Sequence, residues 1–263
     1  DKLGYILSDS GAAAIVSDAR LHKVTAQIAP SVPTLATVIK VGEPTEAALS
    51  LEALLERHEP GPELPGVIPV DMAALVYTSG STGNPKGVML SHQNMVFAQG
   101  SLVEYLRLSD DDRIMNLLPL AFDYGLYQLL MSVHLGATLI LEKTFAFPAA
   151  IVKRVIEEEV TVFPGVPTVF ATLLSLHRNA PLSMPSVRRF TNTAAHLPDE
   201  YVPGLLEISP NALIYKMYGL TECKRVCYLE PELVLDKPLS VGKAIPGTET
   251  YLLDDDGAVV PPG

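Results

Sequence analysis

Apolar and polar positions follow two different periods along most of the chain. Short runs of apolar, often β-branched residues are typical of buried strands, and longer segments with an apolar residue every three or four positions are typical of amphipathic helices. The short runs predict strands at residues 12–18, 34–42, 73–79, 87–91, 113–120, 136–142, 160–166, 187–193 and 212–219. The longer segments predict helices at residues 51–58, 92–106, 124–135, 149–161, 167–178 and 199–209.

This alternation of strands and helices predicts an α/β fold with stacked, largely parallel β-sheets flanked by helices. Residues 58–71 interrupt the pattern with four prolines and two glycines, which indicates a linker or a long loop. We therefore expect a partial first subdomain over residues 1–70 and a larger core over residues 71–263.

Composition and charge narrow the class of protein. Apolar residues make up 48% and charged residues 19% of the chain, as in globular proteins, and the net charge of −11 argues against a general nucleic-acid surface. The longest apolar stretch, residues 129–141, is too short to span a membrane, and the first residues lack the pattern of a signal peptide. We expect a cytoplasmic protein without a membrane span, with Cys223 and Cys227 as reduced thiols and His92 and His134 in structural roles.

A glycine-rich segment, "YTSGSTGNPKGVMLSH" at residues 77–92, lies between two apolar runs. Glycines let backbone N–H groups converge on phosphate oxygens, while hydroxyl groups donate further bonds and a lysine supplies charge. The spacing is not that of a Walker-type loop, because Pro85 is the fifth residue after Gly80 and Gly87 follows Lys86. The alternative for a loop of this composition is a flexible surface turn.

The string "YTSGSTGNPKGV" (77–88) closely resembles the phosphate-binding signature of the AMP-forming adenylate-forming enzymes. This superfamily comprises acyl-CoA synthetases, amino-acid adenylation domains and luciferase-like ligases. Four further segments resemble the family's motifs in the same order: "LPLAFDYG" (118–125), "VTVFPGVPTVF" (160–170), "TNTAAHLP" (191–198) and "IYKMYGLTE" (214–222). The resemblance implies the fold of the large domain of these ligases.

The resemblance implies two half-reactions that need no protein nucleophile. A carboxylate attacks the α-phosphate of ATP to form an acyl-adenylate, and a thiol then expels AMP, so the protein positions the reactants and stabilises phosphate charge. By resemblance, the β- and γ-phosphates are bound by Thr78, Ser79, Gly80, Ser81, Thr82, Gly83 and Lys86. Thr221 is expected near the α-phosphate and Glu222 on Mg²⁺, which makes Thr221, Glu222 and Lys86 the candidate catalytic residues. The adenine is expected against the ring of Tyr218 and the backbone of Ala194, Ala195 and His196.

Phe122 and Asp123 are the candidate determinants of the acid substrate. Many fatty-acyl and aryl ligases resembling this chain carry histidine where it has Phe122, whereas amino-acid adenylation domains carry Phe-Asp, whose aspartate pairs with the substrate's ammonium group. A carboxylate facing an apolar pocket is costly without a cation, which favours an amino-bearing substrate. The alternative is that Asp123 turns away and caps the helix that follows it.

Lys224 and Arg225 directly follow the motif that contains Glu222. They are the remaining candidate substrate-binding residues, because either could direct a positive charge at a second anionic group, such as a side-chain carboxylate or a phosphate of the thiol donor. The alternative is an ordinary pair of solvated surface charges.

The expected activity is therefore ATP- and Mg²⁺-dependent activation of a carboxylic acid, with an α- or β-amino acid favoured. The expected acceptor is the thiol of an acyl or peptidyl carrier protein or of coenzyme A. A fatty-acid or other organic-acid CoA ligase, or a nucleotide-binding module without catalysis, are the alternatives. The family's ribose-binding aspartate and its C-terminal domain with a catalytic lysine are expected after residue 263, so the chain resembles the middle of the large domain, and the isolated piece is expected to be weakly active or inactive.

Overall fold

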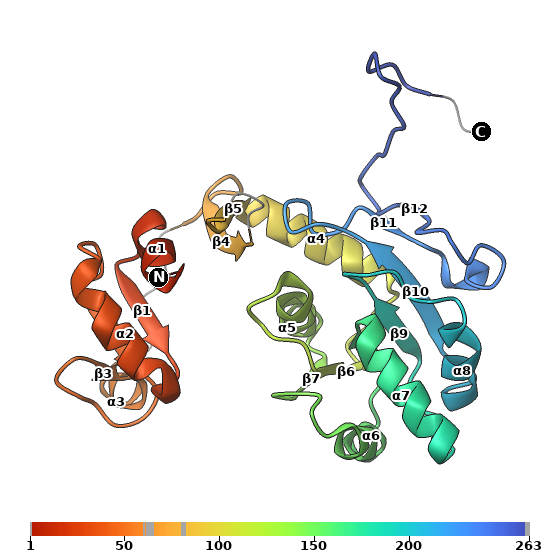
Figure 1. Cartoon of the computed structure of the whole chain (residues 1–263), viewed down its shortest axis with the longest axis horizontal. Coiled ribbons are helices and arrows are strands. Elements are labelled where there is room, and N and C mark those ends of the chain that lie inside the picture. The colour runs from red at the N-terminus through yellow and green to blue at the C-terminus, as the bar shows by residue number, and fades with distance from the viewer. Residues whose placement is uncertain (1, 60, 62–65, 80–82, 261–263) are drawn as a thin grey trace. The chain divides into compact units, whose positions relative to one another are not determined.

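The computed structural model describes residues 2–59, 61, 66–79 and 83–260, which form two compact units, residues 1–92 and residues 93–263 (Figure 1). The strands at 72–91 group with the first unit, and the domain boundary expected after residue 70 stays a prediction. Whether residues 1–70 form a subdomain of their own stays a prediction.

The first unit begins with a small parallel sheet. Its elements are α1 (Lys2–Asp9), β1 (Ala14–Ser17), α2 (His22–Ile28), β2 (Thr37–Lys40), β3 (Leu49–Ser50) and α3 (Leu51–Arg57), with short 3₁₀ turns η1 (Ala19–Leu21) and η2 (Ala29–Ser31). The strands pair in the order β1-β2-β3, all parallel. Leu7, Ile28 and Val32 form the small core beneath them. The strands expected at 12–18 and 34–42 and the helix expected at 51–58 are confirmed.

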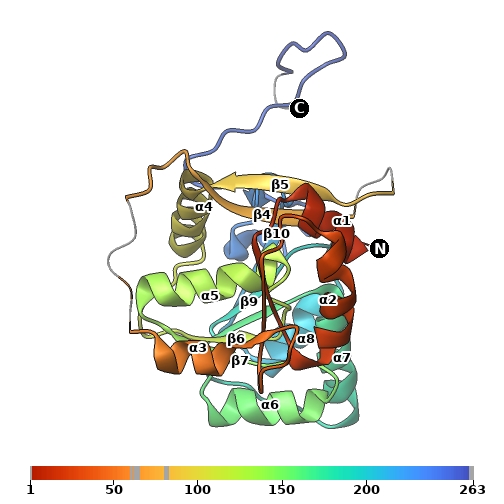
Figure 2. The same ribbon diagram turned by 90° about the vertical axis from the view of Figure 1, so that its left-hand side faces the viewer.

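A β-hairpin completes the first unit. Strand β4 (Met72–Thr78) pairs antiparallel with β5 (Lys86–Ser91), and Figure 2 shows the two strands side by side. The ring of Tyr77 packs over Gly87, where an added Cβ would lie 3.1 Å from the ring, and its hydroxyl donates to Asp9 over 2.7 Å. The hairpin thus fixes the two ends of the glycine-rich loop in register.

The second unit is built on a seven-stranded sheet. Its elements are α4 (His92–Tyr105), β6 (Arg113–Asn116), α5 (Asp123–Leu135), β7 (Thr138–Leu141), α6 (Pro148–Glu157), β8 (Val162–Gly165), α7 (Pro167–Asn179), β9 (Arg189–Asn192), α8 (Tyr201–Ile208), β10 (Leu213–Tyr218), β11 (Cys227–Tyr228), η3 (Pro231–Leu233) and β12 (Lys243–Ala244). The strand order is β12-β11-β10-β9-β8-β6-β7, parallel from β10 to β7 and antiparallel at the β11 and β12 edge. The expected α/β fold with largely parallel sheets is confirmed.

Successive strand residues point to opposite faces of this sheet, and each face has its own core. On one face Phe163 and Phe190 pack with residues of α6, α7 and α8. On the other, Val162 and Tyr215 pack with residues of α4 and α5, and Figure 1 shows the two groups of helices on opposite sides. Strands buried on both faces explain the continuous apolar runs in the sequence.

Two predicted elements end earlier in the structure, each for a local reason. The strand expected to reach residue 120 stops at Asn116, whose buried side chain accepts from Leu118 N–H and donates to the carbonyl of Gly125. The helix expected to reach residue 161 stops at Glu157, because Glu159 adopts a positive φ of 49° that turns the chain into β8. In the part of the chain that the structure describes, no helix is long and apolar enough to cross a lipid bilayer.

Candidate functional site

The candidate residues of the second unit follow the carboxyl ends of its parallel strands. Asp123 comes after β6, residues 194–196 come after β9, and Tyr218 ends β10. Because β6, β8, β9 and β10 all run in the same direction, these segments emerge at one edge of the sheet. Ligands of open α/β sheets bind at this edge.

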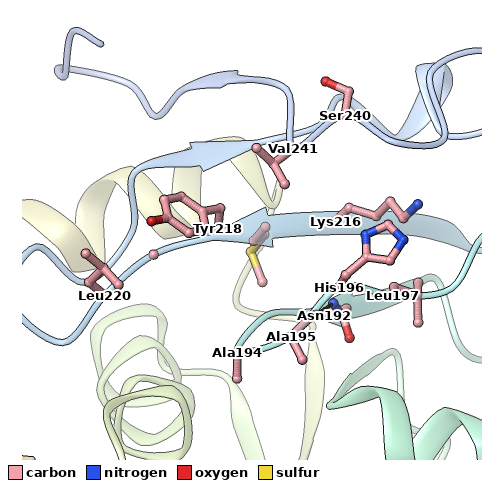
Figure 3. A pocket seen from close by; sticks show the side chains of 12 residues that line it. Asn192, Ala194, Ala195, His196, Leu197, Lys216, Tyr218, Leu220, Ser240 and Val241 are labelled. Carbon is pink, nitrogen blue, oxygen red and sulfur yellow. Dashed lines mark hydrogen bonds between the residues drawn. The ribbon is translucent and has the colours of Figure 1, made fainter. Parts of the chain in front are cut away.

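A pocket of about 320 Å³ lies where β9 and β10 end; we call it the β9–β10 pocket (Figure 3). Its walls come from residues 192–197, 216–220 and 240–241. All four expected adenine-binding residues line it, namely Ala194, Ala195, His196 and Tyr218. Tyr218 is 46% exposed, so part of this residue is accessible to a ligand. The structure therefore brings the adenine candidates together, while their role stays a prediction.

Sequence analysis missed other residues of this pocket, above all Lys216. Lys216 lies in β10 within "IYKMY", is only 3% exposed, and forms an ion pair with Asp199. The signal was present in the sequence, since a lysine inside an otherwise apolar buried strand needs a partner. Ser240 and Val241, the opposite wall of the pocket, follow η3 and carried no comparable signal.

A second cluster gathers the candidate substrate residues Asp123, Lys224 and Arg225. Lys224 is 2% exposed and Arg225 is 4% exposed, so the alternative that they are solvated surface charges is wrong. Arg225 Nη1 lies 3.7 Å from Asp123 Oδ2, and its guanidinium lies 5.1 Å from the centroid of the Tyr124 ring. Burial of this aromatic group raises the pKa of Tyr124 to about 12, so its ring remains neutral beneath the cation.

A tight loop after β10 turns both cations inward. An added Cβ at Gly219 would lie 2.2 Å from the carbonyl oxygen of Lys224, so only glycine allows the chain to fold back this closely. Lys224 itself adopts a φ of 62°, which is strained for a residue with a side chain. Val226 N–H then donates to the Tyr218 carbonyl over 2.9 Å and closes the loop.

The two cations are incompletely paired. Among the described residues, no hydrogen-bond partner reaches Lys224 Nζ or Arg225 Nε. Desolvation lowers the pKa of Lys224, and the nearby Asp123 carboxylate opposes that shift. A buried ammonium without an anionic partner is costly.

Asp123 partly fulfils the helix-capping alternative as well. It is the first residue of α5, its Oδ1 accepts from the N–H of Tyr124 over 3.0 Å, and its Oδ2 faces Arg225. The first turn of α5 packs closely against the preceding segment, because a Cβ added at Gly125 would lie 2.4 Å from the carbonyl oxygen of Pro119. The carboxylate therefore both sits at a helix N-terminus and belongs to the charged cluster.

The remaining candidates of this unit lie at the surface beside the cluster. Phe122 is the N-cap residue of α5 and is 66% exposed. Thr221 is half-buried and Glu222 is exposed, both within the loop that carries the two cations. Cys223 and Cys227 are both free thiols, as expected.

The phosphate-loop candidates lie in the first unit, at the end of the hairpin. Thr78 is the last residue of β4 and is directly paired with Lys86, the first residue of β5, which is exposed. Ser79 is exposed, and Gly83 has a φ of 100°, a conformation that favours glycine. The candidates Gly80, Ser81 and Thr82 lie outside the described residues.

Comparison with known proteins places this architecture in a family. The family model of AMP-binding enzymes matches residues 1–263. The chain is 29% identical over 266 residues to tyrocidine synthase 3 from Brevibacillus parabrevis, covering 100% of this chain and 4% of that protein.

Solved structures give the same result. VinN is 33% identical with a TM-score of 0.84, covering 100% of this chain and 63% of VinN, and it has also been solved with L-aspartate and with 3-methylaspartate. An anthranilate CoA ligase, AuaEII, in complex with anthranoyl-AMP is 25% identical with a TM-score of 0.89, covering 100% of this chain and 51% of that chain. The chain thus spans 63% or less of each of these three relatives. Since the family model matches from the first residue to the last and the fold is that of adenylate-forming ligases, this chain belongs to the AMP-binding enzyme family.

Proposed function

We propose that the chain is the nucleotide- and acid-binding part of a ligase that uses ATP to activate an amino acid carrying a second carboxylate. The observation that carries this proposal is the buried cluster in which Asp123 faces Arg225 beside the ammonium of Lys224, which has no hydrogen-bond partner among the described residues. Asp123 binds the substrate's ammonium group, and Lys224 and Arg225 bind the carboxylate that does not react.

The charges of the cluster favour this class of substrate. One carboxylate and two cations give the cluster a net charge of +1, and an amino acid with two carboxylates carries a net charge of −1 at neutral pH. A fully compensated set of charges is what a site removed from water requires. An amino acid with a single carboxylate would leave Lys224 without an anion, and an unaminated acid would leave Asp123 with Arg225 alone.

The comparisons support the same class. VinN, the 33% identical relative, has been solved with L-aspartate and with 3-methylaspartate, and both are amino acids with two carboxylates. Tyrocidine synthase 3 and the anthranilate CoA ligase support acid activation more generally. The acceptor of the activated acid is a thiol, either of a carrier protein or of coenzyme A.

The chemistry needs positioning rather than a protein nucleophile. The reacting carboxylate of the substrate attacks the α-phosphorus of ATP, the bond from that phosphorus to the oxygen that bridges to the β-phosphate breaks, and pyrophosphate leaves. Lys86 and the hydroxyl and N–H groups of the glycine-rich loop bind the β- and γ-phosphates, and Thr221 binds near the α-phosphate. Tyr218 and residues 194–196 hold the adenine in the β9–β10 pocket. Each of these groups either stabilises the charge that develops on the phosphate oxygens or orients the reactants.

Glu222 fits a magnesium ion that arrives with the nucleotide. Its carboxylate is exposed, it supplies the hard oxygen that Mg²⁺ prefers, and such ions commonly use one or two carboxylates together with substrate phosphates. The part of the chain that the structure describes contains no group of three or more His, Cys, Asp or Glu able to hold a metal alone. When bound, the ion neutralises phosphate charge.

The proposal is tested by ATP–pyrophosphate exchange with the full-length natural protein. The acids are L-aspartate, L-asparagine, β-alanine, succinate, benzoate and hexanoate, so that the amine and the second carboxylate are each removed separately. We expect exchange with L-aspartate at least about tenfold faster than with asparagine, β-alanine or succinate, since an unpaired buried charge costs on the order of 1.4 kcal/mol or more.

Preference for hexanoate or benzoate would instead identify an acyl or aryl ligase in which Asp123 serves α5 alone. AMP binding without exchange for any acid would identify a nucleotide-binding module without catalysis. Either result would overturn the proposal.

A further inference from the structure

The ammonium group of Lys216 joins two segments that face each other across the β9–β10 pocket. It donates to the carboxylate of Asp199 and, over 2.5 Å, to the carbonyl oxygen of Pro238. Asp199 ends the segment that begins with the pocket residues 194–197, whereas Pro238 lies just before the pocket residues Ser240 and Val241. Figure 3 shows the lysine side chain between His196 on one side and the segment of Ser240 on the other.

Residues 237–241, which we call the strap, belong to no helix or strand and end in the pocket residues Ser240 and Val241. The strap's own bonds are local: Lys237 N–H donates to the carbonyl of Leu233, Ser240 N–H donates to that of Lys237, and Ser240 Oγ accepts from Gly242 N–H. Leu239, in its middle, is 82% exposed. In the part of the chain that the structure describes, the hydrogen bond that joins the strap to β10 is the one from Lys216 Nζ to the carbonyl oxygen of Pro238.

The bond is strong because the ammonium is buried. The Lys216 side chain is 4% exposed, so releasing the strap would leave a desolvated N–H donor unpaired. That penalty opposes release of the strap from Lys216.

We propose that Lys216 is a positioning residue for the nucleotide: its ammonium clamps the strap to the segment of Asp199, so that both walls of the β9–β10 pocket are in place before the adenine binds. This inference rests on the proposed function in one respect, the assignment of adenine to this pocket. A pocket whose wall is already ordered binds more tightly, because no binding energy is spent on closing it.

The test is calorimetric binding of AMP to the full-length natural protein and to its Lys216→Met variant, which keeps most of the apolar stem and loses the ammonium. We expect the Kd for AMP to rise about tenfold or more, since the fraction of molecules with a closed strap falls. In pyrophosphate exchange the KM for ATP should rise by a similar factor, while the rate at saturating ATP and the KM for the acid stay near those of the wild type. If Lys216 were merely structural, its replacement would not raise the KM for ATP while leaving the rate at saturating ATP and the KM for the acid unchanged.

Arg113→Met is the matched control, because Arg113 also donates to a carboxylate and a backbone carbonyl, both of Glu158, away from the pocket. It should leave AMP binding unchanged. Asp199→Ala is the second variant, to be used if Lys216→Met fails to fold. It removes the carboxylate that pairs with Lys216 from a partly exposed position, and it should also weaken AMP binding.

The outcomes separate this inference from the proposed function. Wild-type protein that binds no AMP would overturn the assignment of the pocket, and with it both proposals. Wild-type binding that Lys216→Met and Asp199→Ala leave unchanged would overturn the clamp alone.

Discussion

Replacing Asp123 with asparagine is expected to lower kcat/KM for L-aspartate by roughly two to three orders of magnitude. The change keeps the shape of the side chain and removes the charge that pairs with the substrate's ammonium, and losing one partner of a buried charge pair costs on the order of 3–4 kcal/mol. The measurement is pyrophosphate exchange at a series of acid concentrations.

The same variant should improve the use of succinate relative to the wild type. Asp123 lies 3.7 Å from Arg225 in the free site and competes with an incoming carboxylate for that cation. Without it the cluster carries a net charge of +2, which suits an unaminated dicarboxylate. Equal losses with both acids would mean that Asp123 serves only the start of α5, where it accepts from Tyr124 N–H.

Replacing Lys224 with methionine is expected to have opposite effects on activity and stability. Exchange with L-aspartate should fall about a hundredfold, because the second carboxylate loses a buried partner, while exchange with β-alanine should change little. The unliganded protein should nonetheless become more stable, because an ammonium that is 2% exposed and has no partner among the described residues is removed. Kinetics and urea denaturation of the same preparations measure both effects.

The stability gain of Lys224→Met should depend on pH. Desolvation lowers the pKa of Lys224 below its ordinary value of 10.5, so the unfolded chain binds more protons than the folded chain between the lowered and the ordinary pKa. The wild type therefore gains stability as the pH rises through that window, and the advantage of the variant shrinks.

Lys243→Met is the control for both readouts. This lysine side chain is 64% exposed and pairs with Glu230 away from the cluster, so neither activity nor the pH dependence should follow the pattern of Lys224→Met. A Lys224→Met protein that is less stable and equally active would contradict an anion-binding role.

The apolar periodicity was sufficient to locate the parallel strands β6 to β10 of the main sheet and the helices that cover it, but not the two-residue strands β11 and β12 at its edge. The run at 212–219 became β10 (Leu213–Tyr218), and the segment at 124–135 became α5. Strands buried on both faces have few polar residues, so this signal is strong in a mostly parallel sheet. The adenine candidates could also be predicted, since a family motif followed each of two neighbouring strands, and these motifs meet in the β9–β10 pocket.

The burial of Lys224 and Arg225 could not be derived in the same way. Adjacent residues in regular structure point in different directions, and nothing in the periodicity marks the loop that turns both inward. That loop depends on the close approach of the Lys224 carbonyl to Gly219 and on the positive φ at Lys224, which are tertiary features. Strained backbone of this kind is most common at functional sites, where local sequence rules are expected to fail.

The most direct test of an amino acid with two carboxylates as substrate is a crystal structure of the protein with the sulfamoyl analogue of aspartyl-adenylate. The account predicts the adenine in the β9–β10 pocket, the ligand's ammonium within about 3 Å of Asp123, and its free carboxylate at a similar distance from Lys224 Nζ and Arg225. A free carboxylate in solvent, with Lys224 still unpartnered, would contradict it.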